Sequence, residues 1–319
     1  MERGLSRIIR YSPSKFLIWP IKQLIIIGGP TASGKTGLSV ALAKELNTVI
    51  LSADSRQFYR EMSIGTAKPS KEEMDDVKHY FIDSHNIQDE VTAGQFEKEA
   101  TEILEKEFQD HDRIILVGGS GMFIDALCSG LDDIPASKEL QDQLQHELET
   151  LGLQALQKEL KIKDPSYFAQ MDEQNPARVL RALEAIRITG KPYSELRKGA
   201  EKKRPFEVIR FVIDWPRQQL YERINLRVDL MMQEGLLEEV KALEKHQSLR
   251  SMNTVGYKEL FAHLSGELSL EDAVAQIKQN SRRYAKRQLT WFKRHPETTW
   301  LKADSHERML KAILKKLTS

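Results

Sequence analysis

The chain has 319 residues, with 48 Lys and Arg against 47 Asp and Glu, and 40% of its residues are hydrophobic. This composition is typical of a soluble globular protein with one large domain or two smaller ones, and no apolar run approaches the ~20 residues that span a bilayer. Because the net charge is near zero, a nucleic-acid-binding surface requires local clustering of basic side chains. Cys128 is the only cysteine, which excludes an intrachain disulfide and leads us to expect a reducing, cytoplasmic compartment.

Residues 1–22 are basic, and their short apolar run ends at Pro20. That run is too short for a secretory signal. The composition fits an organellar leader or a flexible N-terminal extension, and we favour the flexible extension.

The most informative stretch lies between residues 24 and 46. Residues 24–27 are apolar and predict a buried parallel strand, and residues 38–46 predict an amphipathic helix. Between them lies a sequence that fits the phosphate-binding loop pattern, Gly29, Pro30, Thr31, Ala32, Ser33, Gly34, Lys35 and Thr36. We expect the loop N–H groups and Lys35 to bind phosphate and the Thr36 hydroxyl to hold Mg²⁺.

Further strands are predicted at residues 48–52, 79–83 and 113–117, with a helix from Thr92 whose start has a capping-box pattern with Gln95. This alternation predicts an α/β fold, a phosphate-loop (P-loop NTPase-like) parallel sheet flanked by helices. Residues 137–200 read as helices only, and a strand returns at 210–215. We therefore predict a core of residues 23–130 and 201–319 interrupted by an all-helical insertion, residues 131–200.

Two polar residues fall at predicted strand ends, where ligands of such sheets bind. Asp54 follows the second strand, and there a carboxylate either holds a metal, takes a proton or only shapes a turn. The strand at 113–117 ends in Gly118, Gly119 and Ser120, without the acidic residue that orders Mg²⁺ in many NTPases. That absence argues against ATP hydrolysis.

Two groups of basic residues stand out on predicted helices. Arg223 and Arg227 share a helix face and are either solvated arginines or a clamp for phosphate. The densest basic run contains Lys278, Arg282, Arg283, Lys286, Arg287, Lys293 and Arg294, with aromatic residues interleaved. This run is either a solvated helix face or a surface for nucleic-acid phosphates.

Together these segments resemble the tRNA dimethylallyltransferases, the bacterial-type tRNA isopentenyltransferase (IPP transferase) family. The resemblance covers about residues 24–303 and rests on the loop at 29–36 and on the motifs at 52–57, 64–69, 118–121, 178–184, 255–257 and 284–288. The order of the motifs at 52–57 and 64–69 is more specific than the phosphate loop alone. Ser120 departs from the threonine usual in the family but keeps the hydroxyl.

The resemblance implies transfer of a dimethylallyl group from dimethylallyl pyrophosphate to N6 of an adenosine beside the tRNA anticodon, in tRNAs reading codons that begin with U. It implies catalytic roles for Asp54 as base and for Ser120 and Arg227 at the pyrophosphate, with Mg²⁺ as cofactor. The residues it implies for tRNA binding are Asp54, Ser55, Arg56, Gln57, Arg178, Arg181, Asn253, Gly256, Tyr257, Lys258, Arg282, Arg283, Lys286 and Arg287. We expect a cytoplasmic monomer with the tRNA anticodon stem-loop as partner and no membrane contact.

Three other classes share part of this pattern. A small-molecule kinase shares the loop and the sheet but has no use for the basic helix. A non-catalytic RNA-binding protein explains that helix but not Asp54 and Ser120 at strand ends. An enzyme that alkylates free adenine nucleotides needs neither the insertion nor the basic helix.

Overall fold

The computed structural model describes residues 21–199 and 202–318, so the predicted N-terminal extension lies outside them except for its last two residues. Six parallel strands form one sheet in the order β3-β2-β4-β1-β5-β6. The strands are β1 (Gln23–Gly28), β2 (Ile50–Ala53), β3 (His79–Tyr80), β4 (Arg113–Gly118), β5 (Glu207–Asp214) and β6 (Thr299–Lys302). The predicted parallel sheet of an α/β fold is confirmed.

Helices cover both faces of the sheet, which explains why residues 24–27 of β1 and 114–116 of β4 are apolar and fully buried on both sides. Leu24 and Ile26 of β1 pack in a core with α3 (Ala93–Glu107) and α4 (Gly121–Ser129). Ile25 and Ile27 point to the other face, where α1 (Lys35–Leu46) and α14 (His306–Leu317) complete a second core. All four β1 side chains are fully buried.

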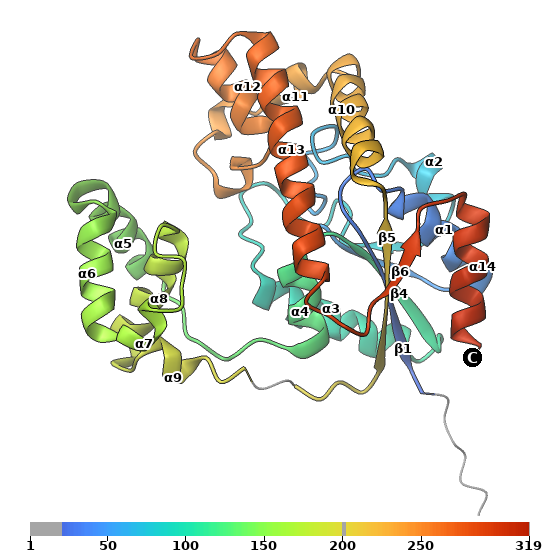
Figure 1. Ribbon diagram of the computed structural model, residues 1–319, viewed down its shortest axis with the longest axis horizontal. Helices are drawn as coiled ribbons and strands as arrows, with labels where there is room; N and C mark the ends of the chain where they lie inside the picture. Colours follow the sequence, from blue (N-terminus) through green and yellow to red (C-terminus); the bar gives the residue numbers. More distant parts are fainter. Residues whose placement is uncertain (1–20, 200–201, 319) are drawn as a thin grey trace, which may run out of the picture.

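A separate group of helices stands at the carboxyl ends of the strands (Figure 1). It comprises α10 (Arg217–Gln233), α11 (Leu236–Ala242), α12 (Tyr257–Leu264) and α13 (Leu270–Phe292), with two short 3₁₀ turns at Glu244–His246 and Arg250–Met252. Its core includes Val228, Leu236, Tyr257 and Ile277. A short helix, α2 (Lys71–Met74), follows the loop after β2. This group forms the roof over the edge of the sheet where ligands bind in such folds.

Residues 138–196 form five helices that share one apolar core (Figure 1). They are α5 (Lys138–Leu151), α6 (Leu153–Lys163), α7 (Pro165–Phe168), α8 (Pro176–Thr189) and α9 (Tyr193–Leu196). Figure 1 shows them beside the sheet. They lie within the segment for which only helices were predicted.

Two local predictions differ in detail from the structure. β3 has two residues, because Phe81 and Asp83 adopt positive φ angles of 66° and 52° that end the strand. At α3 the Thr92 hydroxyl caps the Gln95 N–H at 3.1 Å, but the Gln95 amide donates to Glu99 instead of returning to Thr92. Half of the predicted capping box therefore forms.

Within the described part of the chain, every helix is too short or too polar to cross a bilayer.

Candidate functional site

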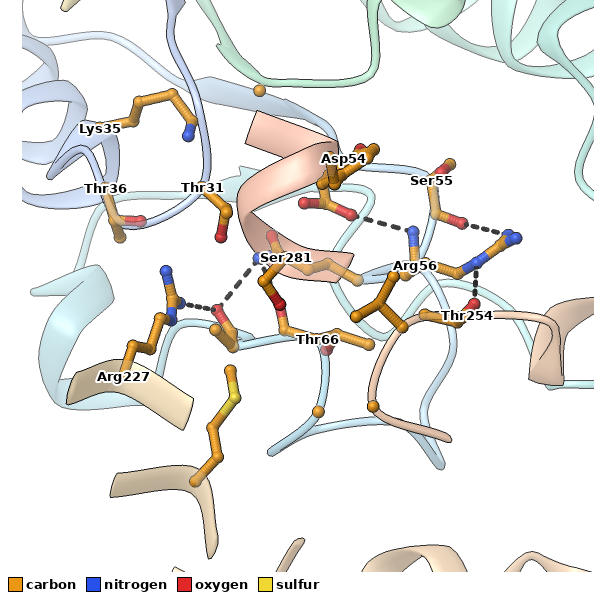
Figure 2. A pocket seen from close by; sticks show the side chains of 18 of the residues that line it. Thr31, Lys35, Thr36, Asp54, Ser55, Arg56, Thr66, Arg227, Thr254 and Ser281 are labelled. Atoms are coloured by element: carbon orange, nitrogen blue, oxygen red, sulfur yellow. Dashed lines mark hydrogen bonds between the residues drawn. The ribbon is translucent and has the colours of Figure 1, made fainter. Parts of the chain in front are cut away.

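A cavity of about 310 Å³ lies at the carboxyl ends of β1, β2 and β4, beneath α10 and α13 (Figure 2). Its polar lining includes Thr31, Lys35 and Thr36 of the loop between β1 and α1, together with Asp54 and Arg227. Side chains of Ile224, Val228, Met231, Leu236, Val255 and Ile277 give it an apolar part. The cavity thus joins an anion-binding region to an apolar space and a carboxylate.

The β1–α1 loop, residues 29–36, is held from several sides. Gly34 is the N-cap of α1 with φ 88°, a conformation that favours glycine. The Ala32 carbonyl accepts from Arg223 Nε at 2.8 Å, and the Ser33 carbonyl accepts from Trp215 Nε1 at 3.0 Å. The N–H groups in the first turn of α1 have no acceptor within the helix. This end of the helix is therefore a ready site for phosphate.

Two partly buried cations, Lys35 of this loop and Arg227 of α10, line the cavity together. Burial and the neighbouring Arg227 charge together lower the pKa of Lys35 to about 8, against the opposing effect of the Asp54 charge. Burial likewise lowers the pKa of Arg227. The Lys35 ammonium donates to the Pro30 carbonyl at 2.7 Å, and Arg227 Nη2 contacts the Ala67 carbonyl at 3.4 Å. A di- or triphosphate group is the kind of ligand that would offset this crowding of positive charge.

Asp54 follows β2 directly and projects into the cavity (Figure 2). Its Oδ1 accepts the backbone N–H of Arg56 at 3.0 Å, which fixes the orientation of the carboxylate. Arg56 in turn donates through Nε to Thr254 Oγ1 at 2.5 Å. The turn after β2 is therefore tied to the segment before α12, and the carboxylate is aimed at the cavity as a preorganised group.

Gln57 and Glu239 hold the segment 63–67, which contributes Gly65, Thr66 and Ala67 to the lining of the cavity. The Gln57 amide donates to the carbonyls of Thr66 and Ala67 at 3.2 and 3.1 Å. The Glu239 carboxylate receives the backbone N–H groups of Ser63, Ile64 and Gly65 at 2.8–3.0 Å and the Tyr257 hydroxyl at 2.6 Å. Burial raises the pKa of Tyr257, which keeps the phenol protonated as a donor. Nothing in the sequence pattern singled out Glu239.

Ser120 lies beside the residues that line the cavity rather than among them. It is the N-cap of α4, and its Oγ accepts the Ser55 N–H at 3.1 Å. Burial and the Asp54 charge raise the pKa of the nearby Tyr284 to about 12, although an interaction with Ser120 lowers it, so the phenol stays neutral. The predicted contact of Ser120 with pyrophosphate stays a prediction.

One face of α13 borders the cavity through Ile277, Ser281, Tyr284 and Gln288, spaced at helical intervals. Arg287 also lines it and lies 5.6 Å from the Tyr284 ring centre. Tyr284 and Gln288 belong to the motif at 284–288 on which the resemblance rests, whereas nothing in the sequence pattern marked Ser281.

The predicted basic run divides into two groups in the structure. Lys278 pairs with Asp229 at 2.5 Å and Arg282 donates to Asn225 at 2.6 Å, so both contact α10. The other five members of the run are exposed: Arg283, Lys286, Arg287, Lys293 and Arg294. The exposed group is the part of the run that is free to meet a polyanion.

The remaining predicted tRNA contacts lie in two segments, residues 253–258 at the start of α12 and residues 178–181 of α8. Asn253 and Gly256 line the cavity, Lys258 is exposed, and the Tyr257 side chain is fully buried. On α8, Arg178 is exposed, while Arg181 donates to the carbonyls of Ile134 and Pro135 and to Glu184 at 2.6–2.9 Å. Arg181 thus fastens α8 to the connection before α5, and the tRNA roles of these residues stay predictions.

The donor set for a divalent cation is small. Among the described residues, no group of three or more His, Cys, Asp or Glu side chains could hold a metal ion. Thr36 and Asp54 both line the cavity. Such a set fits Mg²⁺, which keeps several waters and is held by one or two protein oxygens plus substrate phosphates, better than it fits a metal in an all-protein cage.

The fold and the site define an α/β protein with a glycine-containing loop after β1, a carboxylate at the end of β2 in the same cavity, and a separate group of helices at residues 138–196. The sequence model of the IPP transferase family matches residues 57–295, and the chain belongs to this family. It is 46% identical over 290 residues to tRNA dimethylallyltransferase 1 of Bacteroides fragilis, covering 91% of this chain and 96% of that protein.

Two solved structures agree with this assignment. A tRNA isopentenylpyrophosphate transferase from Bacillus halodurans is 37% identical with a TM-score of 0.70, covering 93% of this chain and 96% of that one. A eukaryotic dimethylallyltransferase acting on tRNA superposes with a TM-score of 0.76 at 25% identity, covering 93% of this chain and 77% of that one.

Proposed function

We propose that this protein transfers a dimethylallyl group from dimethylallyl pyrophosphate to N6 of the adenosine 3′-adjacent to the anticodon, in tRNAs reading codons that begin with U. The products are N6-(dimethylallyl)adenosine and pyrophosphate. The observation that carries the proposal is one cavity in which Asp54 lies between the phosphate-binding loop and α13.

The donor binds with its pyrophosphate at the β1–α1 loop. Lys35, the first-turn N–H groups of α1 and Arg227 neutralise its charge, and they stabilise the additional charge that develops as the C1–O bond breaks. The apolar lining at Ile224, Val228 and Met231 provides a place for the hydrocarbon. Ser120, which lies next to the residues that line the cavity, adds a hydrogen bond to the pyrophosphate.

The acceptor nitrogen is a weak nucleophile, because its lone pair is delocalised into the adenine ring. It attacks C1 of the donor, the pyrophosphate leaves with the bonding electrons, and the N6 proton passes to the Asp54 carboxylate. The hydrogen bond from the Arg56 N–H orients that carboxylate before the base arrives. The adenosine enters the cavity as an extruded base.

We propose Mg²⁺ as the cofactor, with the Thr36 hydroxyl as its protein contact. The ion would supply charge neutralisation at the pyrophosphate.

The tRNA binds across the core and the insertion. Exposed basic residues of α13, together with Arg178, contact phosphates, whereas Asp54, Ser55, Arg56, Gln57 and the segment 253–258 surround the target nucleotide. This assignment accounts for a basic helix that neither a small-molecule kinase nor an enzyme acting on free nucleotides requires. We propose that the protein acts in the cytoplasm as a monomer.

The test is incubation with labelled dimethylallyl pyrophosphate and Mg²⁺ in three parallel reactions, with total tRNA, AMP or ATP. We expect label in tRNA alone. Label in AMP or ATP at comparable rates would assign the free-nucleotide reaction, and transfer of γ-phosphate from ATP would assign a kinase.

A further inference from the structure

Helix α13 contacts the β1–α1 loop directly through one buried side chain. Gln288 Oε1 accepts the backbone N–H of Thr31 at 2.9 Å, and Gln288 Nε2 donates to the Gly119 carbonyl at 3.0 Å. The side chain is 6% exposed. One amide therefore joins α13 to the loop after β1 and to the loop after β4.

Glycines at three positions let α13 pack closely against the backbone near the ends of β1 and β4. A Cβ atom at Gly119 would lie 2.1 Å from Gln288 Nε2, and one at Gly121 would lie 2.2 Å from the Trp291 ring. A Cβ at Gly28 would lie 2.5 Å from the Phe292 ring. A side chain at Gly28 or Gly121 would thus displace an aromatic ring of α13, and one at Gly119 would displace the Gln288 amide.

The opposite side of the same helix is exposed and positive. Arg283 and Lys286 lie within one and a half turns of Gln288, and Lys293 and Arg294 follow just beyond it. Because α13 is one continuous helix of 23 residues, a polyanion that shifted this side of the helix would shift Gln288 as well.

Among the hydrogen bonds that side chains of other elements make to the loop in the described part of the chain, that of Gln288 is the one that comes from the helix with the exposed basic side. The Ala32 carbonyl is held by Arg223 of α10, and the Ser33 carbonyl by Trp215 before α10. The Gln288 contact also uses the N–H of Thr31, a residue that lines the cavity. The position of the N–H groups of the β1–α1 loop therefore depends on the position of α13 relative to that loop.

We propose that Gln288 is a positioning residue that couples the two substrate sites, so that RNA bound on the basic side of α13 and pyrophosphate bound in the β1–α1 loop raise each other's affinity. The inference rests on the proposed function, since it takes tRNA as the polyanion. Coupling between two binding sites is reciprocal and typically amounts to 5- to 150-fold. We expect at least about fivefold in this protein.

The test measures the dissociation constant of inorganic pyrophosphate by calorimetry, with and without a saturating tRNA anticodon stem-loop. Gln288→Met keeps the length and packing of the side chain but removes both hydrogen bonds. Gln288→Asn keeps the amide but is too short to span both partners, and it serves as a second variant should the first fold poorly. Gln279→Ala changes an exposed glutamine of the same helix and is the control.

We expect the stem-loop to tighten pyrophosphate binding in the wild type and in Gln279→Ala. In both Gln288 variants it should change the dissociation constant of pyrophosphate less than about twofold. The affinity of the Gln288 variants for RNA in the absence of pyrophosphate should equal that of the wild type. Equal coupling in wild type and Gln288 variants, or none in a wild type that does transfer the prenyl group, would overturn the inference alone. A wild type that neither binds the stem-loop nor modifies it would overturn the proposed function and the inference with it.

Discussion

The Lys35 ammonium donates to the Pro30 carbonyl of its own loop at 2.7 Å. The lysine that we expect to bind phosphate therefore contacts the loop backbone instead. This hydrogen bond gives the ammonium an acceptor, but burial and the neighbouring Arg227 charge still lower its pKa to about 8. The arrangement implies that a phosphate oxygen would replace the carbonyl and raise the pKa again.

This gives a pH dependence for donor binding. Below pH 8 Lys35 is protonated in the free protein, so binding of the donor takes up no proton. Above pH 8 Lys35 is neutral in the free protein, so binding of the donor must take up one proton. The affinity for dimethylallyl pyrophosphate, whose last ionisation lies near pH 6, should then fall by up to about tenfold per pH unit. Calorimetric titration without tRNA from pH 7 to 10 measures it. Lys35→Arg stays charged and should lose this decline, and a flat wild-type profile would contradict the role of Lys35.

Asp54→Asn should lower the rate of transfer by about 10²- to 10⁴-fold, the usual contribution of a general base. The side chain keeps its size and an oxygen for the Arg56 N–H, so tRNA affinity should change little. Single-turnover kinetics with saturating tRNA measures the loss. Turnover within about threefold of the wild type would remove Asp54 from the proton transfer.

The exposed basic side of α13 should govern the salt dependence of tRNA binding. If Arg283 and Lys286 each contact a phosphate, replacing both by alanine should reduce the slope of log affinity against log salt by about one to two units. Donor affinity should be unaffected, because neither residue lines the cavity. The matched control replaces Lys311 and Lys315 of α14, which are exposed on another part of the surface. Equal slopes in the wild type and the α13 variant would mark that side as a solvated face.

Glu239 should contribute more to stability than its partial exposure suggests. Replacing it by alanine leaves three backbone N–H groups and the Tyr257 hydroxyl without an acceptor, which should cost about 2–4 kcal/mol. Tyr257→Phe removes one hydrogen bond and should cost about 1 kcal/mol. Urea unfolding of both variants measures the difference, and a smaller loss for Glu239→Ala than for Tyr257→Phe would contradict the account.

The sequence predicted those parts of the protein that depend on local pattern. The buried strand at residues 24–27 and the glycines of the loop after it are adjacent in the chain, so their geometry follows from neighbouring residues. Asp54 was found because parallel strands place their carboxyl ends together. The IPP transferase motifs then predicted the family.

The contacts that complete the site could not be predicted in this way. Gln288 meets Thr31 across 257 positions of the chain, and Glu239 meets Gly65 across 174. Such pairs depend on how α10 to α13 pack over the sheet, which hydrophobic periodicity does not determine. The same packing draws Lys278 and Arg282 toward α10, so charge density alone overstated the exposed basic surface.

The central claim is transfer to the exocyclic nitrogen of one adenosine beside the anticodon. The most direct test uses an anticodon stem-loop RNA with adenosine 3′ to the anticodon and a second RNA with purine riboside, which lacks N6, at that position. After incubation with dimethylallyl pyrophosphate and Mg²⁺, mass spectrometry of the RNA and of its nucleosides should show one added dimethylallyl group on the adenosine of the first RNA and none on the second. Equal modification of both RNAs, or modification at another nucleotide, would contradict the account.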